Sequence, residues 1–105
     1  MPEWRPVCAD RDLPADSMQR FTLAGDEITL IRVGDELYAV DDTCTHGAVS
    51  LSEGELITGE RPRVECWLHG SEFDLSTGQP TCLPATVALR TYPVRIVEDT
   101  IEIGL

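Results

Sequence analysis

The sequence predicts an all-β, antiparallel fold, and three observations support this prediction. Two glycine–aspartate pairs, Gly25-Asp26 and Gly34-Asp35, are typical of tight turns between strands. Apolar and polar residues alternate over residues 100–105, as in a strand with one buried face. No segment has a sustained helical period, because Pro and Gly interrupt most candidates.

The two turns divide the first part of the chain into strand-like segments. We expect strands at residues 20–24, 27–33 and 36–41, joined by tight hairpins into a three-stranded meander. A further hairpin is expected near the end of the chain, where residues 94–97 turn at Glu98-Asp99 into residues 100–105. The two hairpin regions therefore predict a β-sheet base for the domain, in which one face of the strand at residues 100–105 is buried.

The middle of the chain has a different pattern. Short strand-like segments at residues 63–66 and 72–75 flank loops that carry cysteine and histidine. We therefore predict a single domain of residues 1–105, in which residues 42–85 form an insertion. The β base would be built from residues 1–41 and 86–105.

Two short motifs in this insertion carry the chemistry. Cys44-Thr45-His46-Gly47 has the spacing C-x-H, and Cys66-Trp67-Leu68-His69-Gly70 has the spacing C-x2-H. Each loop offers one thiolate and one imidazole, and the glycines after the histidines allow the turns that the loops need. Two thiolates and two imidazoles that converge on one point are the ligand set of a Rieske 2Fe-2S centre, in which histidines replace cysteines on one of the two irons. The candidate ligands are Cys44, His46, Cys66 and His69.

Two other uses of the same residues remain open. A structural zinc site also accepts two cysteines and two histidines, although its usual spacing pairs C-x2-4-C with H-x3-5-H. Four cysteines could also form two disulfides in a small secreted domain, but residues 1–30 contain no apolar run with the flanks of a signal peptide. We expect Cys8 and Cys82 to be buried free thiols, and a cytoplasmic location.

The pattern resembles the Rieske family, and the chain as a whole resembles the small soluble ferredoxins of bacterial aromatic-ring-hydroxylating dioxygenase systems. Beyond the candidate ligands, the matching segments are Asp42-Thr43, Leu51-Ser52-Glu53-Gly54, Glu72-Phe73-Asp74 and Thr77-Gly78. The resemblance implies a Rieske-like antiparallel β-sandwich base with an inserted cluster-binding subdomain and one Rieske-type 2Fe-2S cluster. It also implies that Cys44 and Cys66 bind one iron, that His46 and His69 bind the other, and that a proline-bearing loop, here residues 80–84, covers the cluster.

The chain departs from related proteins at positions that affect potential and docking. Rieske proteins of respiratory cytochrome complexes carry an additional cysteine in each loop, where this chain has Val49 and Leu68. They also have a serine and a tyrosine whose hydroxyls raise the potential, where this chain has Ser71 and Phe73. We therefore expect a potential at the low end of the family range of about −150 to +300 mV. Soluble ferredoxins commonly have proline where this chain has Trp67. The Trp67 side chain either contacts a docked partner or packs within the fold.

The charge of the chain favours some partners and argues against others. Its 105 residues include 19 acidic and eight basic residues, which give a formal net charge of −11. This charge argues against nucleic acid as a partner, and the lack of a long apolar stretch argues against a membrane span. Residues 42–85 are also acidic, so we expect carboxylates there to steer a basic partner face toward the cluster. These charged residues are Asp42, Glu53, Glu55, Glu60, Glu65, Glu72 and Asp74, against Arg61 and Arg63.

The residues available favour an electron carrier over an enzyme. A terminal oxygenase also needs a mononuclear iron, typically held by two histidines and a carboxylate, and this chain has only the two histidines of the cluster motifs. The resemblance implies a one-electron carrier between a flavin-containing, NAD(P)H-dependent ferredoxin reductase and a terminal ring-hydroxylating oxygenase. The alternatives are a small Rieske-like subunit of assimilatory nitrite reductase, which often lacks the ligands, and a zinc-stapled interaction module.

Overall fold

Antiparallel strands make up most of the fold. The structure is a computed structural model and describes residues 2–45, 49–68, 70–83 and 85–105. The described strands form three sheets, with the orders β1-β10-β9, β2-β3-β4-β8 and β5-β6-β7. Their bounds, with two short 3-10 helices, are β1 (Trp4–Ala9), η1 (Asp10–Asp12), β2 (Ser17–Leu23), β3 (Asp26–Val33), β4 (Glu36–Asp41), η2 (Leu51–Glu53), β5 (Glu55–Ile57), β6 (Arg63–Glu65), β7 (Glu72–Asp74), β8 (Thr91–Tyr92), β9 (Val94–Val97) and β10 (Thr100–Gly104).

The predicted meander is confirmed as β2, β3 and β4, with a two-residue turn at each end of β3. Leu23 pairs with Asp26, and Val33 pairs with Glu36. The first turn is therefore Ala24-Gly25, one residue earlier than predicted. Both of its residues have left-handed backbone, with φ of +51° and +85°, which is the geometry of a tight hairpin turn. β2 is also longer at its N-terminal end than the sequence predicted.

The predicted C-terminal hairpin is confirmed as β9 and β10. Its turn residues, Glu98 and Asp99, both have positive φ although neither is glycine. Ile101 and Ile103 on β10 are fully buried, as the alternation predicted. β10 also pairs with β1, from Trp4 opposite Gly104 to the other end of the strand, so the two ends of the chain share one sheet. This pairing was not predicted, because its partners lie far apart in sequence.

Two buried cores lie on opposite sides of the β3-β4 hairpin. The base core consists of Leu13, Ile28, Leu30, Ala39, Tyr92, Ile101 and Ile103. The site core consists of Ile31, Val40, Cys44, Leu51, Val64, Cys66, Phe73, Leu75, Ala85 and Leu89. Ile28 and Leu30 belong to the base core and Ile31 belongs to the site core, so β3 is buried on both faces. This explains why the middle of β3 is a nearly continuous run of apolar residues.

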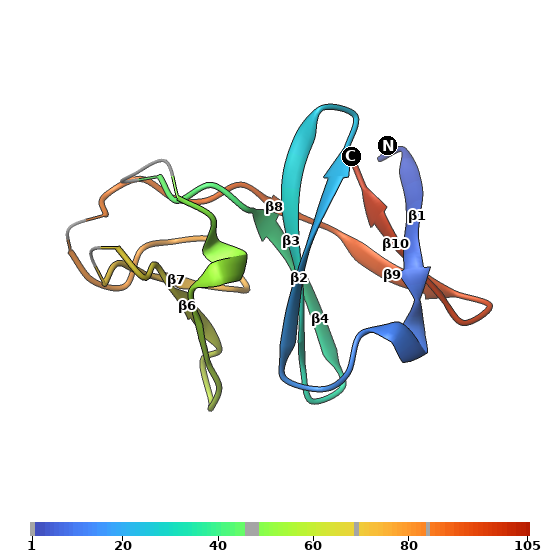
Figure 1. Cartoon of the computed structure of the whole chain (residues 1–105), viewed down its shortest axis with the longest axis horizontal. Coiled ribbons are helices and arrows are strands. Elements are labelled where there is room, and N and C mark those ends of the chain that lie inside the picture. Colours follow the sequence, from blue (N-terminus) through green and yellow to red (C-terminus); the bar gives the residue numbers. More distant parts are fainter. Residues whose placement is uncertain (1, 46–48, 69, 84) are drawn as a thin grey trace.

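The sheet β5-β6-β7 and its loops lie to one side of the other two sheets. Figure 1 shows them at the left, with the sheets of β2-β3-β4 and β1-β10-β9 at the right. The chain leaves the four-stranded sheet at the end of β4 and returns to it at β8, which pairs with β4 through Ala39 opposite Tyr92. The site loops are therefore attached to the base where β4 ends and β8 begins.

Candidate metal centre

A short antiparallel ladder holds the first cysteine motif. Thr43 forms a bridge with Ser50, and the backbone N–H of Cys44 donates to the carbonyl of Val49 at 3.0 Å. On the other side of the Thr43–Ser50 bridge, the Leu51 N–H donates to the Asp42 carbonyl at 2.6 Å. Cys44 is therefore paired with Val49 two positions before the predicted ligand His46. His46 itself lies outside the described residues.

The buried carboxylate of Asp42 fastens this ladder to the base. Its Oδ1 accepts hydrogen bonds from the Thr29 hydroxyl at 2.5 Å, the Ser50 hydroxyl at 2.8 Å and the Ser52 N–H at 3.1 Å. Burial raises the pKa of this carboxyl, but the hydrogen bonds from Thr29, Ser50 and Ser52 outweigh burial and hold the pKa below its ordinary value. Asp42 is therefore an anion that links β3 to both arms of the first loop. Arg20 lies 3.8 Å from its second oxygen.

The second cysteine motif forms the connection between β6 and β7. The Cys66 N–H donates to the Ser71 carbonyl at 2.7 Å, and the Gly70 N–H donates back to the Cys66 carbonyl at 3.0 Å. Gly70 has a φ of +73°, a left-handed conformation that residues with a side chain rarely adopt, so the glycine after the second histidine is needed for this turn. His69, the predicted ligand between them, lies outside the described residues.

The two cysteines come together in the structure. Cys44 is 4% exposed and Cys66 is 1% exposed, and both belong to the site core with Leu51, Phe73 and Leu89. Cys66 is a free thiol. Two sulfur atoms from separate segments of the chain therefore lie in one buried core. This placement suits a group that bridges the loops.

The segment after β7 packs along the second loop and reaches the first. Thr81 donates its N–H to the Glu72 carbonyl at 2.8 Å, and Pro80 forms a bridge with Phe73. The Thr45 hydroxyl of the first loop donates to the Val87 carbonyl at 2.7 Å. The described residues of this segment therefore contact β7 and the first loop, whereas the expectation that residues 80–84 cover a cluster stays a prediction. Pro84, part of that expectation, lies outside the described residues.

The expectation that Cys8 and Cys82 are buried is wrong. Cys82 is exposed, and its Sγ donates to the Gly70 carbonyl at 3.4 Å. Cys8 is only half-buried, because β1 is an edge strand with a register shift between Pro6 and Cys8. Both are free thiols, as is Cys66, so the reading of four cysteines as two disulfides is also wrong.

Ser71 provides a test of whether the site fits an iron–sulfur cluster. Its side chain is fully buried, and its hydroxyl oxygen has no hydrogen-bond partner among the described residues. Leaving a buried hydroxyl unpaired costs about 1–3 kcal/mol, so an acceptor outside the described residues is expected here. The sulfur atoms of a cluster accept such hydrogen bonds. Two buried cysteines beside a buried donor hydroxyl therefore fit a 2Fe-2S cluster.

Comparison with known proteins decides the family. The family model described as "Rieske [2Fe-2S] domain" matches residues 3–93. The chain belongs to the Rieske family. Its cofactor is accordingly one Rieske-type 2Fe-2S cluster, and not a structural zinc ion. In the described part of this Rieske protein, no helix is long and apolar enough to cross a membrane.

Individual relatives are ferredoxins of dioxygenase systems. The anthranilate 1,2-dioxygenase ferredoxin subunit of Burkholderia cepacia is 39% identical over 103 residues, which cover 98% of this chain and 93% of the relative. Among solved structures, a chain of the complex of reduced oxygenase and oxidised ferredoxin in carbazole 1,9a-dioxygenase is 38% identical, with a TM-score of 0.87 and coverage of 96% and 92%. A protein described as an NADH-dependent nitrite reductase small subunit from Mycobacterium tuberculosis has a TM-score of 0.89 and coverage of 100% and 96%, but at 23% identity it shows the fold alone.

Sequence reasoning missed the hydrogen bond between Thr29 and Asp42. The only local signal is a threonine between Ile28 and Leu30, in a strand that is otherwise apolar at this point. A buried hydroxyl needs a partner, but its identity depends on how β3 meets the first loop. Asp42 was noted as part of a family motif, whereas its role as the attachment point of the Rieske loop becomes evident only from the structure.

Proposed function

We propose that this Rieske protein is the ferredoxin of a multicomponent ring-hydroxylating dioxygenase. It carries one electron at a time and is not itself the enzyme. Its electron donor is a flavin-containing, NAD(P)H-dependent ferredoxin reductase, and its acceptor is a terminal Rieske oxygenase. The observation that supports this function most strongly is the burial of Cys44 and Cys66 in one core in a chain that matches dioxygenase ferredoxins over nearly its full length. The proposed location is the cytoplasm, where thiols stay reduced.

The proposed ligands are Cys44 and Cys66 on one iron and His46 and His69 on the other. Support for the cysteines comes from their burial in the same core, and support for the histidines comes from their place in the same two sequence motifs. The cluster, when bound, supplies a one-electron couple. The chain's own residues hold it away from water, and the Ser71 hydroxyl is available to donate to it.

The proposed division of the single domain follows from this assignment. Residues 42–85 would form the cluster-binding subdomain, on a base of residues 1–41 and 86–105. All three strands of the β5-β6-β7 sheet fall within the first range, and the β1-β10-β9 and β2-β3-β4-β8 sheets fall within the second. Asp42 is the first residue of the subdomain, and its bond to Thr29 joins the subdomain to β3. Such a division places the redox centre at one end of the molecule.

The experiment that tests this function is electron transfer to an oxygenase. The chain, purified with its cluster and reduced, is mixed with the oxidised oxygenase of carbazole 1,9a-dioxygenase, and reoxidation of the ferredoxin is followed by its visible absorbance. We expect rapid reoxidation that saturates with oxygenase concentration. No reoxidation beyond the rate in buffer would contradict the proposed function.

A further inference from the structure

Large exposed apolar side chains lie on the loops of the proposed cluster site. Of the six such residues in the described part of the chain, four lie on the loops of the site: Trp67 at 54%, Leu68 at 45%, Leu83 at 76% and Val87 at 61% exposure. We call these four residues the tip patch. Trp67 and Leu68 lie between the proposed ligands Cys66 and His69 of the second loop.

Hydrogen bonds bring the members of the tip patch together from distant parts of the chain. Leu83 follows Cys82, whose Sγ donates to the Gly70 carbonyl of the second loop at 3.4 Å. Val87 accepts the Thr45 hydroxyl of the first loop at 2.7 Å. All four side chains are therefore held on segments that contact the ligand loops. An apolar patch in this position is typical of a surface that is covered by a partner.

A depression of about 340 Å³ adjoins the tip patch at Trp67. Its wall also includes Glu27 from β3 and Glu53 from η2, together with Asp42 and Arg20. Arg20 lies 3.8 Å from Asp42, whereas Glu27 and Glu53 are exposed and make no ion pair with any described residue. Three carboxylates thus face one guanidinium, so the depression is negative and has an aromatic edge.

This combination of groups suits one kind of occupant. An arginine guanidinium is planar, so it can stack on the face of an indole while its N–H groups donate to carboxylates. A lysine ammonium is a compact and strongly hydrated charge that makes less use of an aromatic wall. Acidic and neutral side chains would leave the charge of Glu27 and Glu53 without a partner. The depression therefore selects for arginine.

We propose that the tip patch and this depression form one docking surface, which binds a protein partner through an arginine inserted between Trp67 and Glu53. The inference rests on the proposed function, since the partner is the protein that exchanges electrons with the cluster. The apolar residues exclude water near the cluster, and the arginine fixes the orientation of the partner. Trp67 is then a specificity-determining residue.

The test measures how strongly the reduced holo-protein binds an electron acceptor. The acceptor is the oxygenase of carbazole 1,9a-dioxygenase, and the readout is the oxygenase concentration that gives half-maximal electron transfer at fixed ionic strength. We expect Trp67→Leu and Glu53→Gln each to raise this concentration about fivefold, which corresponds to about 1 kcal/mol. The double variant should raise it by clearly less than the product of the two, because both side chains contact the same guanidinium.

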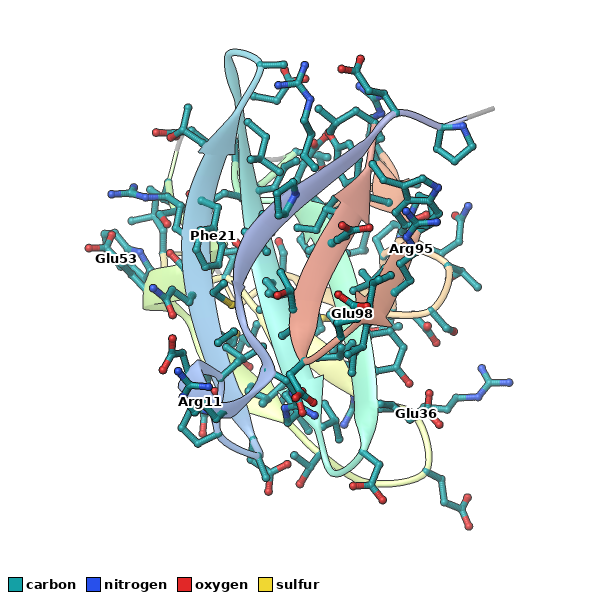
Figure 2. All side chains as sticks on the ribbon, turned by 90° about the vertical axis from the view of Figure 1, so that its right-hand side faces the viewer. Arg11, Phe21, Glu36, Glu53, Arg95 and Glu98 are labelled. Atoms are coloured by element: carbon teal, nitrogen blue, oxygen red, sulfur yellow. The ribbon has the colours of Figure 1, made fainter. Side chains whose placement is uncertain are left out.

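Two matched variants control for general effects. Trp67→Phe keeps an aromatic face and should stay within about twofold of the wild type. Glu36→Gln removes the same charge from an exposed position at the start of β4, and Figure 2 shows Glu36 and Glu53 on opposite sides of the view. It should leave the half-saturating concentration unchanged. The visible spectrum of each variant must match that of the wild type.

The possible outcomes separate this inference from the proposed function. If the wild-type chain transfers electrons but Glu53→Gln behaves like Glu36→Gln, the charged depression has no role and the inference is wrong. Fully additive effects of the two substitutions would also overturn it, since they would place Trp67 and Glu53 on different partner groups. If the wild-type chain transfers no electrons to the oxygenase, the proposed function fails first and the docking surface fails with it.

Discussion

Replacing Thr29 by valine removes one hydrogen bond from the junction between the base and the first cysteine loop. Thr29 is fully buried, and its hydroxyl lies 2.5 Å from Oδ1 of the charged Asp42. A hydrogen bond to a charged group contributes about 1.5–3 kcal/mol, whereas the extra methyl group of valine returns up to about 0.8 kcal/mol through burial. The net loss should be about 1–2 kcal/mol. For a domain of this size, that corresponds to a decrease in Tm of about 5–15 °C.

The assay is thermal unfolding of the holo-protein, followed by far-ultraviolet circular dichroism and by the visible absorbance of the cluster at one scan rate. Thr22→Val makes the same chemical change at an exposed position on β2 and should shift the Tm by no more than a few degrees. Because Asp42 also binds Ser50 and Ser52, Thr29→Val should accelerate loss of the cluster as well. A Thr29→Val protein with the Tm of the Thr22→Val protein would refute the role assigned to the junction.

Three further predictions concern the potential, the pH dependence of stability and the backbone. Ser71→Ala removes the buried hydroxyl that has no described partner. The reduction potential measured by voltammetry should therefore fall by about 40 mV, equivalent to about 1 kcal/mol for one electron. An unchanged potential would show that the hydroxyl does not donate to the cluster. The pKa of Asp74 is lowered, first by the hydrogen bond from the Ser76 hydroxyl, so its stabilising effect is present above the unfolded pKa of about 3.9 and is lost as pH falls through the folded pKa. Asp74→Asn should therefore reduce the free energy of urea unfolding at pH 7, with a difference from wild type that shrinks as the pH falls below about 4, and a constant difference would argue against this assignment. Gly78→Ala places a Cβ 2.2 Å from the Leu89 carbonyl oxygen at a φ of +77° and should prevent normal folding. Gly25→Ala has a φ of +85° but open space around the Cβ, so it should lower the free energy of unfolding by only about 1–2 kcal/mol. Equal unfolding midpoints for the two variants would contradict this difference.

The hairpins were predictable because their signals are local. Gly34 directly follows the last residue of β3, and Ile101 and Ile103 alternate with polar neighbours on β10. Turn conformation and strand alternation depend on residues next to one another, so the sequence alone contains them. The first turn nevertheless lies one residue earlier than predicted, at Ala24-Gly25, and β2 begins at Ser17 instead of residue 20, because strand ends depend on pairing with the neighbouring strand.

Features that depend on long-range packing were not predictable. The pairing of β1 with β10 and the bond from Thr29 to Asp42 join segments whose approach depends on the whole fold. Cysteine is a residue type that is usually buried, but Cys82 is exposed, next to the exposed Leu83. The candidate site lies between these extremes. The cysteine and histidine spacing predicted its location, whereas the burial of Cys44 and Cys66 in one core required the structure.

We propose that a 2Fe-2S cluster is bound by two cysteines and two histidines of this chain. The most direct test of this claim is pulsed electron paramagnetic resonance of the reduced protein, produced with 15N-labelled histidine. We expect an S = 1/2 signal with hyperfine couplings to ring nitrogens of two histidines, since the chain contains two. A colourless protein that contains zinc, or a reduced cluster without coupling to histidine nitrogen, would contradict the claim.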